Sequence, residues 1–173
     1  MKDTKKYIKI NAIIMSSGSG KTTLAKQFPN DLIDIDTIIH TSKNKLIMKE
    51  LRRKALKLYK KGNTNAFDKV NNSYGKLLVK AIKKNPELIN KIFLIHTSNM
   101  FGDANIKVNV IKILKSTKLE INKVAKERAK IDPIWGELTI KNWSEIKSRG
   151  VNYESMKKIV KNIIQNKYKL IKE

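Results

Sequence analysis

The feature that most constrains the fold is an apolar run that passes through a few small residues directly into a helix-forming segment. Residues 7–15, YIKINAIIM, are rich in β-branched side chains and predict a buried strand. Residues 16–20, SSGSG, predict a tight loop, and from Lys21 the composition favours a helix. Pro29 and Asn30 predict the end of that helix. The chain therefore begins with a strand–loop–helix unit.

The same alternation continues to the end of the chain. Further buried strands are predicted at residues 32–35, 91–96 and 108–115. Amphipathic helices are predicted at residues 45–61, 68–84, 117–130, 137–148 and 152–166, the third of them opened by a capping box of Thr117 and Glu120. Residues 168–172, YKLIK, predict a short final strand, whereas GVNY at 150–153 is too short to predict one. Because strands that alternate with helices pair in parallel through crossovers, we expect an α/β fold, a doubly wound parallel sheet of about five strands with helices on both faces.

Length and composition favour one domain in a reducing compartment. A chain of 173 residues suits a single domain, and without cysteine it has no disulfide and no thiolate metal site. Lysines precede an apolar run near the N-terminus, as in a secretion signal, but Asp3, Lys9 and Asn11 interrupt that run. No apolar stretch approaches the roughly 20 residues needed to cross a bilayer. We therefore expect a cytoplasmic protein with no signal peptide and no membrane partner.

The formal net charge of +23 has two explanations. A field of that sign attracts nucleic acid, so the lysine-rich surface predicts non-specific binding to RNA or DNA. Alternatively, a chain crowded with Lys, Asn and Ile reflects AT-rich coding sequence, with lysine as a generic surface residue. Arginine, the better phosphate fork, occurs only four times, at Arg52, Arg53, Arg128 and Arg149. This scarcity favours the second explanation for most of the charge.

The loop and the residues after it suit the binding of a phosphate. Small residues allow successive backbone N–H groups to point inward at an anion. Lys21 would neutralise the outer phosphates, and the Thr22 hydroxyl would help to hold Mg²⁺. The alternative is a Ser/Gly turn that only starts a helix.

The segment resembles the Walker A motif, G-x-x-x-x-G-K-[ST], of the P-loop nucleoside triphosphate-binding family. Gly20, Lys21 and Thr22 match the motif, whereas Met15 occupies the position of its first glycine. Since the phosphate-facing amides come mainly from the later residues, we expect the site to survive Met15 with altered affinity. The resemblance implies that ATP or GTP is bound by Ser17, Gly18, Ser19, Gly20, Lys21, Thr22 and Thr23.

Two carboxylates follow at the end of the second predicted strand. Asp34 and Asp36 alternate along the chain and so point to the same side, at the strand end where ligands bind in doubly wound sheets. This arrangement resembles small-molecule and nucleotide kinases of the P-loop class, such as shikimate, gluconate and nucleoside monophosphate kinases, and polynucleotide 5′-kinases. The resemblance implies that Asp36 orients or deprotonates the acceptor. It also implies that Asp34 belongs to the outer coordination shell of the metal that the Thr22 hydroxyl helps to hold. The alternative is an ordinary polar strand end.

The same resemblance divides the single domain, residues 1–173, into functional regions. It implies a helical acceptor-side insertion around residues 40–85 and a lid around residues 118–140. In the lid, Arg128 would close over the transferring phosphoryl group, unless it only covers a helix surface. In the insertion, Arg52 and Arg53 would bind an acidic or phosphate-bearing acceptor, unless they belong to a solvated helix face.

One departure from the family pattern is the strand at 91–96, which ends in His96 where a Walker B acid is expected. A metal would then depend on Thr22, Asp34 and Asp36. We favour a structural role for His96, and core packing or lid docking for Trp135 and Trp143.

These patterns favour a Mg²⁺-dependent kinase that moves the ATP γ-phosphoryl group to a hydroxyl or phosphate acceptor. The acceptor would be a nucleoside, a nucleotide or a nucleic-acid 5′ end, with Lys21, Asp36 and Arg128 as catalytic residues. The alternative is a nucleic-acid-binding protein that keeps the P-loop scaffold without turnover. A P-loop switch or ATPase acting on other proteins has less support, because no catalytic glutamate or second nucleotide motif is present.

Overall fold

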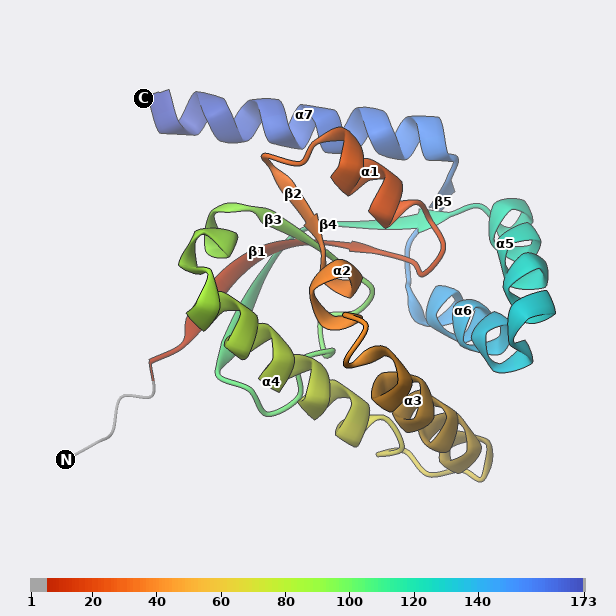
Figure 1. The fold of residues 1–173 in the computed structure, drawn as a ribbon. Helices are drawn as coiled ribbons and strands as arrows, with labels where there is room; N and C mark the ends of the chain where they lie inside the picture. Colours follow the sequence, from red (N-terminus) through yellow and green to blue (C-terminus); the bar gives the residue numbers. More distant parts are fainter. Residues whose placement is uncertain (1–5, 173) are drawn as a thin grey trace.

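The computed structural model describes residues 6–172 (Figure 1). Of residues 168–172 it describes the backbone alone. The strands are β1 (Ile8–Met15), β2 (Leu32–Asp34), β3 (Ile92–Ile95), β4 (Ile106–Ser116) and β5 (Gly150–Val151). The helices are α1 (Lys21–Gln27), α2 (Ile35–Ile39), α3 (Lys45–Lys60), α4 (Asp68–Lys84), α5 (Lys118–Ile131), α6 (Pro133–Glu145) and α7 (Tyr153–Lys172). A short 3-10 turn, η1 (Pro86–Asn90), precedes β3.

The strands form one parallel sheet in the order β2-β3-β1-β4-β5. β1 lies at the centre and pairs with β4 along its whole length, with one irregularity between Ala12 and Ile13. β5 pairs only with Lys115 and Ser116 of β4. Within the described chain, residues 106–114 therefore have no strand partner on their outer edge. The parallel sheet confirms the predicted doubly wound α/β class.

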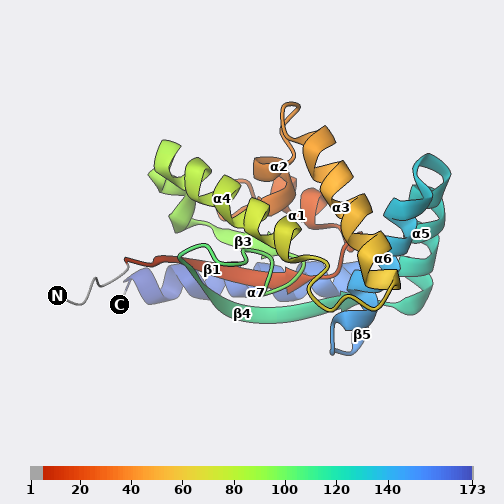
Figure 2. The same cartoon turned by 90° about the horizontal axis from the view of Figure 1, so that it is seen from below.

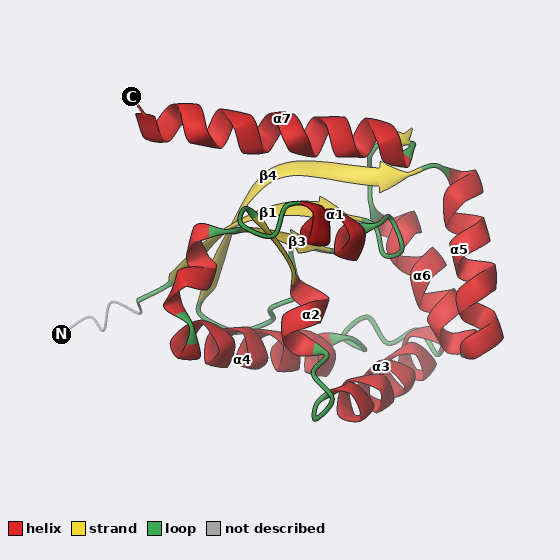
Figure 3. Ribbon diagram, turned by 45° about the horizontal axis from the view of Figure 1, so that its top comes forward, coloured by secondary structure: helices red, strands yellow, loops and turns green. Residues whose placement is uncertain are grey.

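Helices cover both faces of the sheet (Figure 2). α1 and α7 pack on the face that carries Ile13 and Leu94, whereas α2, α3 and α4 pack on the face that carries Ile14 and Phe93. The side chains of neighbouring strand residues thus pack in the cores on opposite faces of the sheet, as the two-residue period of a strand requires. The α5–α6 hairpin instead stands beyond the carboxyl ends of the strands (Figure 3). That position places the hairpin beside the loop that follows β1.

Two predictions near the C-terminus are wrong. Residues 168–172 are helical, because α7, whose residues Met156, Val160 and Ile164 pack on the sheet, does not end at residue 166. The segment judged too short for a strand forms β5, where the chain returns from α6 to lie beside β4. Among the described residues, no helix, α7 included, is apolar enough over a sufficient length to cross a membrane.

The two helices of the hairpin differ in how well their boundaries were predicted. The capping box of Thr117 and Glu120 is confirmed at the start of α5. α6 begins before the predicted residue 137, because Asp132 caps its first turn and Pro133 fits there. It ends at Glu145, before the predicted residue 148. The stretch IDPIWG, which predicts an interruption, therefore makes a tight corner between two helices.

A prediction of stability follows from Gly75 in α4. A Cβ at this position would lie 2.2 Å from the Phe101 carbonyl oxygen and 2.6 Å from the Ala104 Cβ. Gly75→Ala should therefore lower the free energy of unfolding by about 2 kcal/mol, as expected when an added methyl group is packed too closely against the Phe101 backbone. Urea unfolding measures this change. Lys76→Ala at the neighbouring exposed position is the control, and equal stabilities of the two variants would contradict the prediction.

Candidate functional site

The loop between β1 and α1 depends on two glycines. Gly18 and Gly20 have φ values of 80° and 97°, a left-handed conformation that favours glycine. A Cβ at Gly20 would also lie 2.6 Å from the Tyr153 ring, and one at Gly18 would lie 2.7 Å from Val124 Cγ1. Glycine is therefore required twice, both for the turn and for the close approach of α5 and α7.

Met15 does not disturb this loop. Its side chain is fully buried at the end of β1, in the core that contains Leu24 and Leu114. No non-glycine residue of the described chain has a positive φ, so Met15 adopts an unstrained backbone conformation. The bend that the motif requires is made further along, at Gly18 and Gly20. Methionine thus ends the strand, and the left-handed positions of the loop lie at Gly18 and Gly20.

Lys21 lies inside the loop. Its Nζ is 3.4 Å from the Met15 carbonyl oxygen and 3.5 Å from that of Ser16, and the residue is only 6% exposed. Burial lowers the pKa of Lys21, although the nearby charges of Asp36 and Asp34 oppose the shift. The ammonium group is held by weak carbonyl contacts, which an anion entering the loop would replace with a stronger partner.

Thr22 and Asp34 bring two side-chain oxygens together beside the loop. The Thr22 hydroxyl donates to Asp34 Oδ2 at 2.5 Å, and Asp34 Oδ1 accepts from the Asp36 backbone N–H at 3.1 Å. Burial raises the pKa of Asp34, and the charge of Asp36 raises it further. Hydroxyl and carboxylate oxygens beside a phosphate loop suit Mg²⁺. The described residues contain no group of three or more His, Cys, Asp or Glu placed to hold a metal, so phosphate oxygens would have to complete such a site.

Asp36 does not continue the strand as the alternation predicts. Asp34 ends β2 and caps α2, so Asp36 lies in the first turn of a helix that the sequence did not predict. Its Oδ1 is 3.3 Å from His40 Nε2. Burial opposes ionisation, yet the hydrogen bond from His40 and the charge of Lys21 hold the pKa of Asp36 well below its usual range. Asp36 is thus a partly buried carboxylate with a lowered pKa next to the loop.

The two arginines of α3 have different environments. Arg52 Nη1 lies 3.4 Å from the Tyr74 hydroxyl and 3.3 Å from His40 Nε2, and no carboxylate of the described chain lies within ion-pair distance of its guanidinium. Arg53 instead lies 3.7 Å from Asp132 at the start of α6. The structure therefore brings Arg52, but not Arg53, close to Asp36 through His40.

Arg128 reaches the loop from α5. Its Nη1 donates to Ser17 Oγ at 2.9 Å and to Thr139 Oγ1 at 2.8 Å, and its guanidinium lies over the Trp135 ring. The side chain therefore does not lie on the outer surface of α5. Trp143 fixes the hairpin to the sheet, because its Nε1 donates to the Ser116 carbonyl at 2.8 Å.

Asn142 on α6 is a site residue that the sequence did not indicate. Its Oδ1 accepts from the Ser17 backbone N–H at 2.6 Å, and its Nδ2 donates to the His96 carbonyl at 2.9 Å. Asn142 thereby joins the loop, the end of β3 and the hairpin. No signal in the sequence pointed to it, because its partners lie far away along the chain.

A cleft of about 1440 Å³ opens beside the loop. It is lined by several of the predicted site residues, namely Ser17, Thr22, Asp36, Arg52, Arg53 and Arg128, together with His40, Tyr74, His96 and Asn142. Gly18, Ser19, Gly20, Lys21 and Thr23 do not line it. Ser19 is buried with its hydroxyl on the Ser16 carbonyl, and Thr23 is exposed in the first turn of α1. The cleft therefore meets the loop on one side, where an acceptor would approach.

The environment of His96 predicts a pH dependence of stability. Burial lowers its pKa from 6.5 to about 4, although the charge of Asp36 opposes the shift. Because the unfolded chain binds this proton more readily, stability should fall as the pH decreases from about 6.5 to 4. Between pH 7 and 4.5 the wild type should lose about 2 kcal/mol more than His96→Gln in chemical denaturation. Parallel pH profiles for the two proteins would contradict this prediction.

No protein-family model, curated protein or solved structure matches the chain. Function is therefore inferred from the residues that surround the loop and the cleft.

Proposed function

We propose that the protein is a Mg²⁺-dependent kinase that transfers the γ-phosphoryl group of ATP or GTP to an acceptor in the cleft. The observation that carries the proposal is the meeting of four features at one end of the sheet. A glycine-dependent loop encloses a buried lysine. Beside it lie the Thr22–Asp34 oxygen pair, the ionised Asp36 and the arginine of α5. Phosphoryl transfer requires this combination of positioning and charge neutralisation.

In this proposal each residue has a separate task. Loop amides and Lys21 bind the phosphates, and a Mg²⁺ ion near Thr22 and Asp34 would neutralise part of their charge. Because its pKa is lowered, Asp36 is a weak base, so it orients the acceptor hydroxyl and takes its proton only as the new oxygen–phosphorus bond forms and the bond to the β–γ bridging oxygen breaks. Arg128 stabilises the charge on the transferred group. The nucleoside diphosphate leaves with the electrons of the broken bond.

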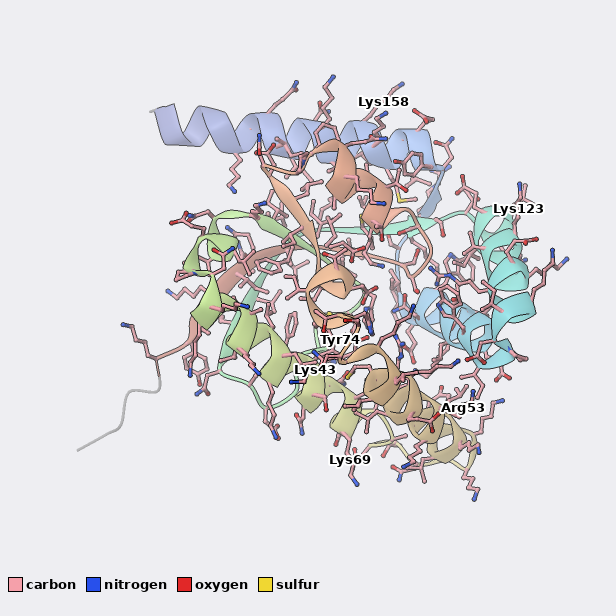
Figure 4. All side chains as sticks on the ribbon, in the orientation of Figure 1. Lys43, Arg53, Lys69, Tyr74, Lys123 and Lys158 are labelled. Atoms are coloured by element: carbon pink, nitrogen blue, oxygen red, sulfur yellow. The ribbon has the colours of Figure 1, made fainter. Side chains whose placement is uncertain are left out.

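The alternative, a nucleic-acid-binding protein, draws its support from the net charge of +23. Charge in the cleft is nearly balanced, because its lining contains six Lys or Arg residues and five Asp or Glu residues. Labelled lysines on α4, α5 and α7 (Lys69, Lys123 and Lys158) point outward on three different sides of the molecule (Figure 4). Dispersed lysines favour weak, salt-sensitive binding of polyanions over one dedicated groove. They give the alternative less support than the site gives to a kinase.

A screen tests the proposal. ATP and GTP are incubated with nucleosides, nucleoside monophosphates and 5′-hydroxyl oligonucleotides in Mg²⁺, and transfer of labelled γ-phosphate is followed beside thermal shifts. We expect a nucleotide-dependent shift and transfer to one acceptor class. Binding to random RNA that disappears at high salt, without any nucleotide-dependent shift, would instead support the alternative.

A further inference from the structure

The α5–α6 hairpin holds the loop through Ser17. Asn142 Oδ1 accepts from the Ser17 backbone N–H at 2.6 Å, and Arg128 donates to the Ser17 hydroxyl at 2.9 Å. The backbone N–H and the hydroxyl of one loop residue are thus both bound by the same hairpin. Asn142 is anchored in turn by its bond to the His96 carbonyl. The amide oxygen of Asn142 therefore occupies a loop N–H group of the kind that binds a phosphate oxygen in such loops.

Ser17 differs from the following loop residues in its position. Ser17 lines the cleft with Thr22 and Asp36, whereas residues 18–21 do not. The phosphate nearest the acceptor must be the one transferred. In the proposed kinase the Ser17 N–H would therefore face the terminal phosphate of a triphosphate, and a diphosphate in the same loop would not reach it.

We infer that Asn142 is a positioning residue that distinguishes a triphosphate from a diphosphate, an inference that rests on the proposed kinase function. A terminal phosphate oxygen displaces Asn142 Oδ1 from the Ser17 N–H, because an anionic acceptor makes the stronger hydrogen bond. The same phosphate approaches Arg128, which donates to the Ser17 hydroxyl. After transfer the N–H is free, and Asn142 binds it again. The hairpin thereby responds to the presence of the transferable group.

Two substitutions of Asn142 should have opposite effects. Asn142→Ala removes the competing acceptor, so the dissociation constant of a non-hydrolysable triphosphate analogue should fall about fivefold. Asn142→Asp leaves a charged oxygen that holds the N–H more strongly and repels the phosphate, so that constant should rise about tenfold. The dissociation constant of the diphosphate should change less than about twofold in both variants, because its phosphates do not reach Ser17.

Calorimetric titration of wild type, Asn142→Ala, Asn142→Asp and the control Ser144→Ala with both ligands tests the inference. Ser144 is exposed on the same helix and bonds only within it. Equal changes for the diphosphate and the triphosphate in the two Asn142 variants would show a merely structural role and overturn the inference alone. Absence of binding of both ligands to the wild type would overturn the proposed function and the inference with it.

A second test uses only the wild-type protein, so its outcome does not depend on whether the Asn142 variants fold. The side-chain amide resonances of Asn142 should shift when the triphosphate analogue is added and stay unchanged with the diphosphate. Identical spectra with the two ligands would contradict the inference.

Discussion

Replacing Lys21 with alanine should lower the rate of phosphoryl transfer about a thousandfold, the loss seen when a preorganised charge is removed from a transition state. The ammonium group lies inside the loop at 3.4 Å from the Met15 carbonyl, in a position that no other cation of the loop can take. Nucleotide binding should weaken as well, because the outer phosphates lose their counter-charge. Transfer of labelled γ-phosphate and calorimetric titration measure the two effects.

The matched control is Lys26→Ala in the last turn of the same helix. It removes the same charge outside the loop and should change the rate less than about threefold. Circular dichroism establishes that both variants are folded. Equal responses of the wild type and Lys21→Ala to nucleotide would contradict the proposed function.

Replacing Asp36 with asparagine should lower transfer about a thousandfold, within the range observed for the loss of a general base. Asparagine keeps an oxygen that can accept from His40, so the contact at 3.3 Å can persist while the charge is lost. Nucleotide affinity should change less than about threefold, because the phosphates are held by the loop. A loss of rate without a loss of binding distinguishes this residue from Lys21.

Glu154→Gln is the control for this change, since Glu154 is an exposed carboxylate in the first turn of α7. Transfer by Asp36→Asn at the wild-type rate would exclude the proposed role of Asp36. A parallel loss of nucleotide binding would place Asp36 among the phosphate or metal contacts instead.

The parts of the fold that the sequence predicted are those set by local patterns. β1, the loop and α1 followed from a β-branched run, small residues and a helix ending near Pro29. The capping box of Thr117 and Glu120 was visible because its partners lie three residues apart. α2 was missed, because Ile35 continues the apolar run of β2 although Asp34 already caps a helix. A capping side chain within a short apolar run gives strand and helix equal support.

The candidate site was predictable where its chemistry is contained in one segment. Lys21 and Thr22 belong to a motif, whereas Asn142 contacts the loop from 125 residues away and Tyr74 meets His40 from another helix. Such contacts depend on how the hairpin and α4 pack, which local patterns do not determine. The same packing separates Arg52 from Arg53, neighbours that the sequence treats alike.

The outer edge of β4 offers a different explanation for part of the positive charge. β5 covers only the end of this strand, and Val110, Ile111 and Ile113 are 36%, 40% and 43% exposed along the remainder. An unpaired strand edge with apolar side chains is a template for aggregation through added strands of other copies. Lys107 and Lys112 interrupt this stretch, and lysine is a common gatekeeper on such edges. We therefore expect Lys107 and Lys112 to oppose self-association at this incompletely covered edge, which would explain a small part of the lysine excess.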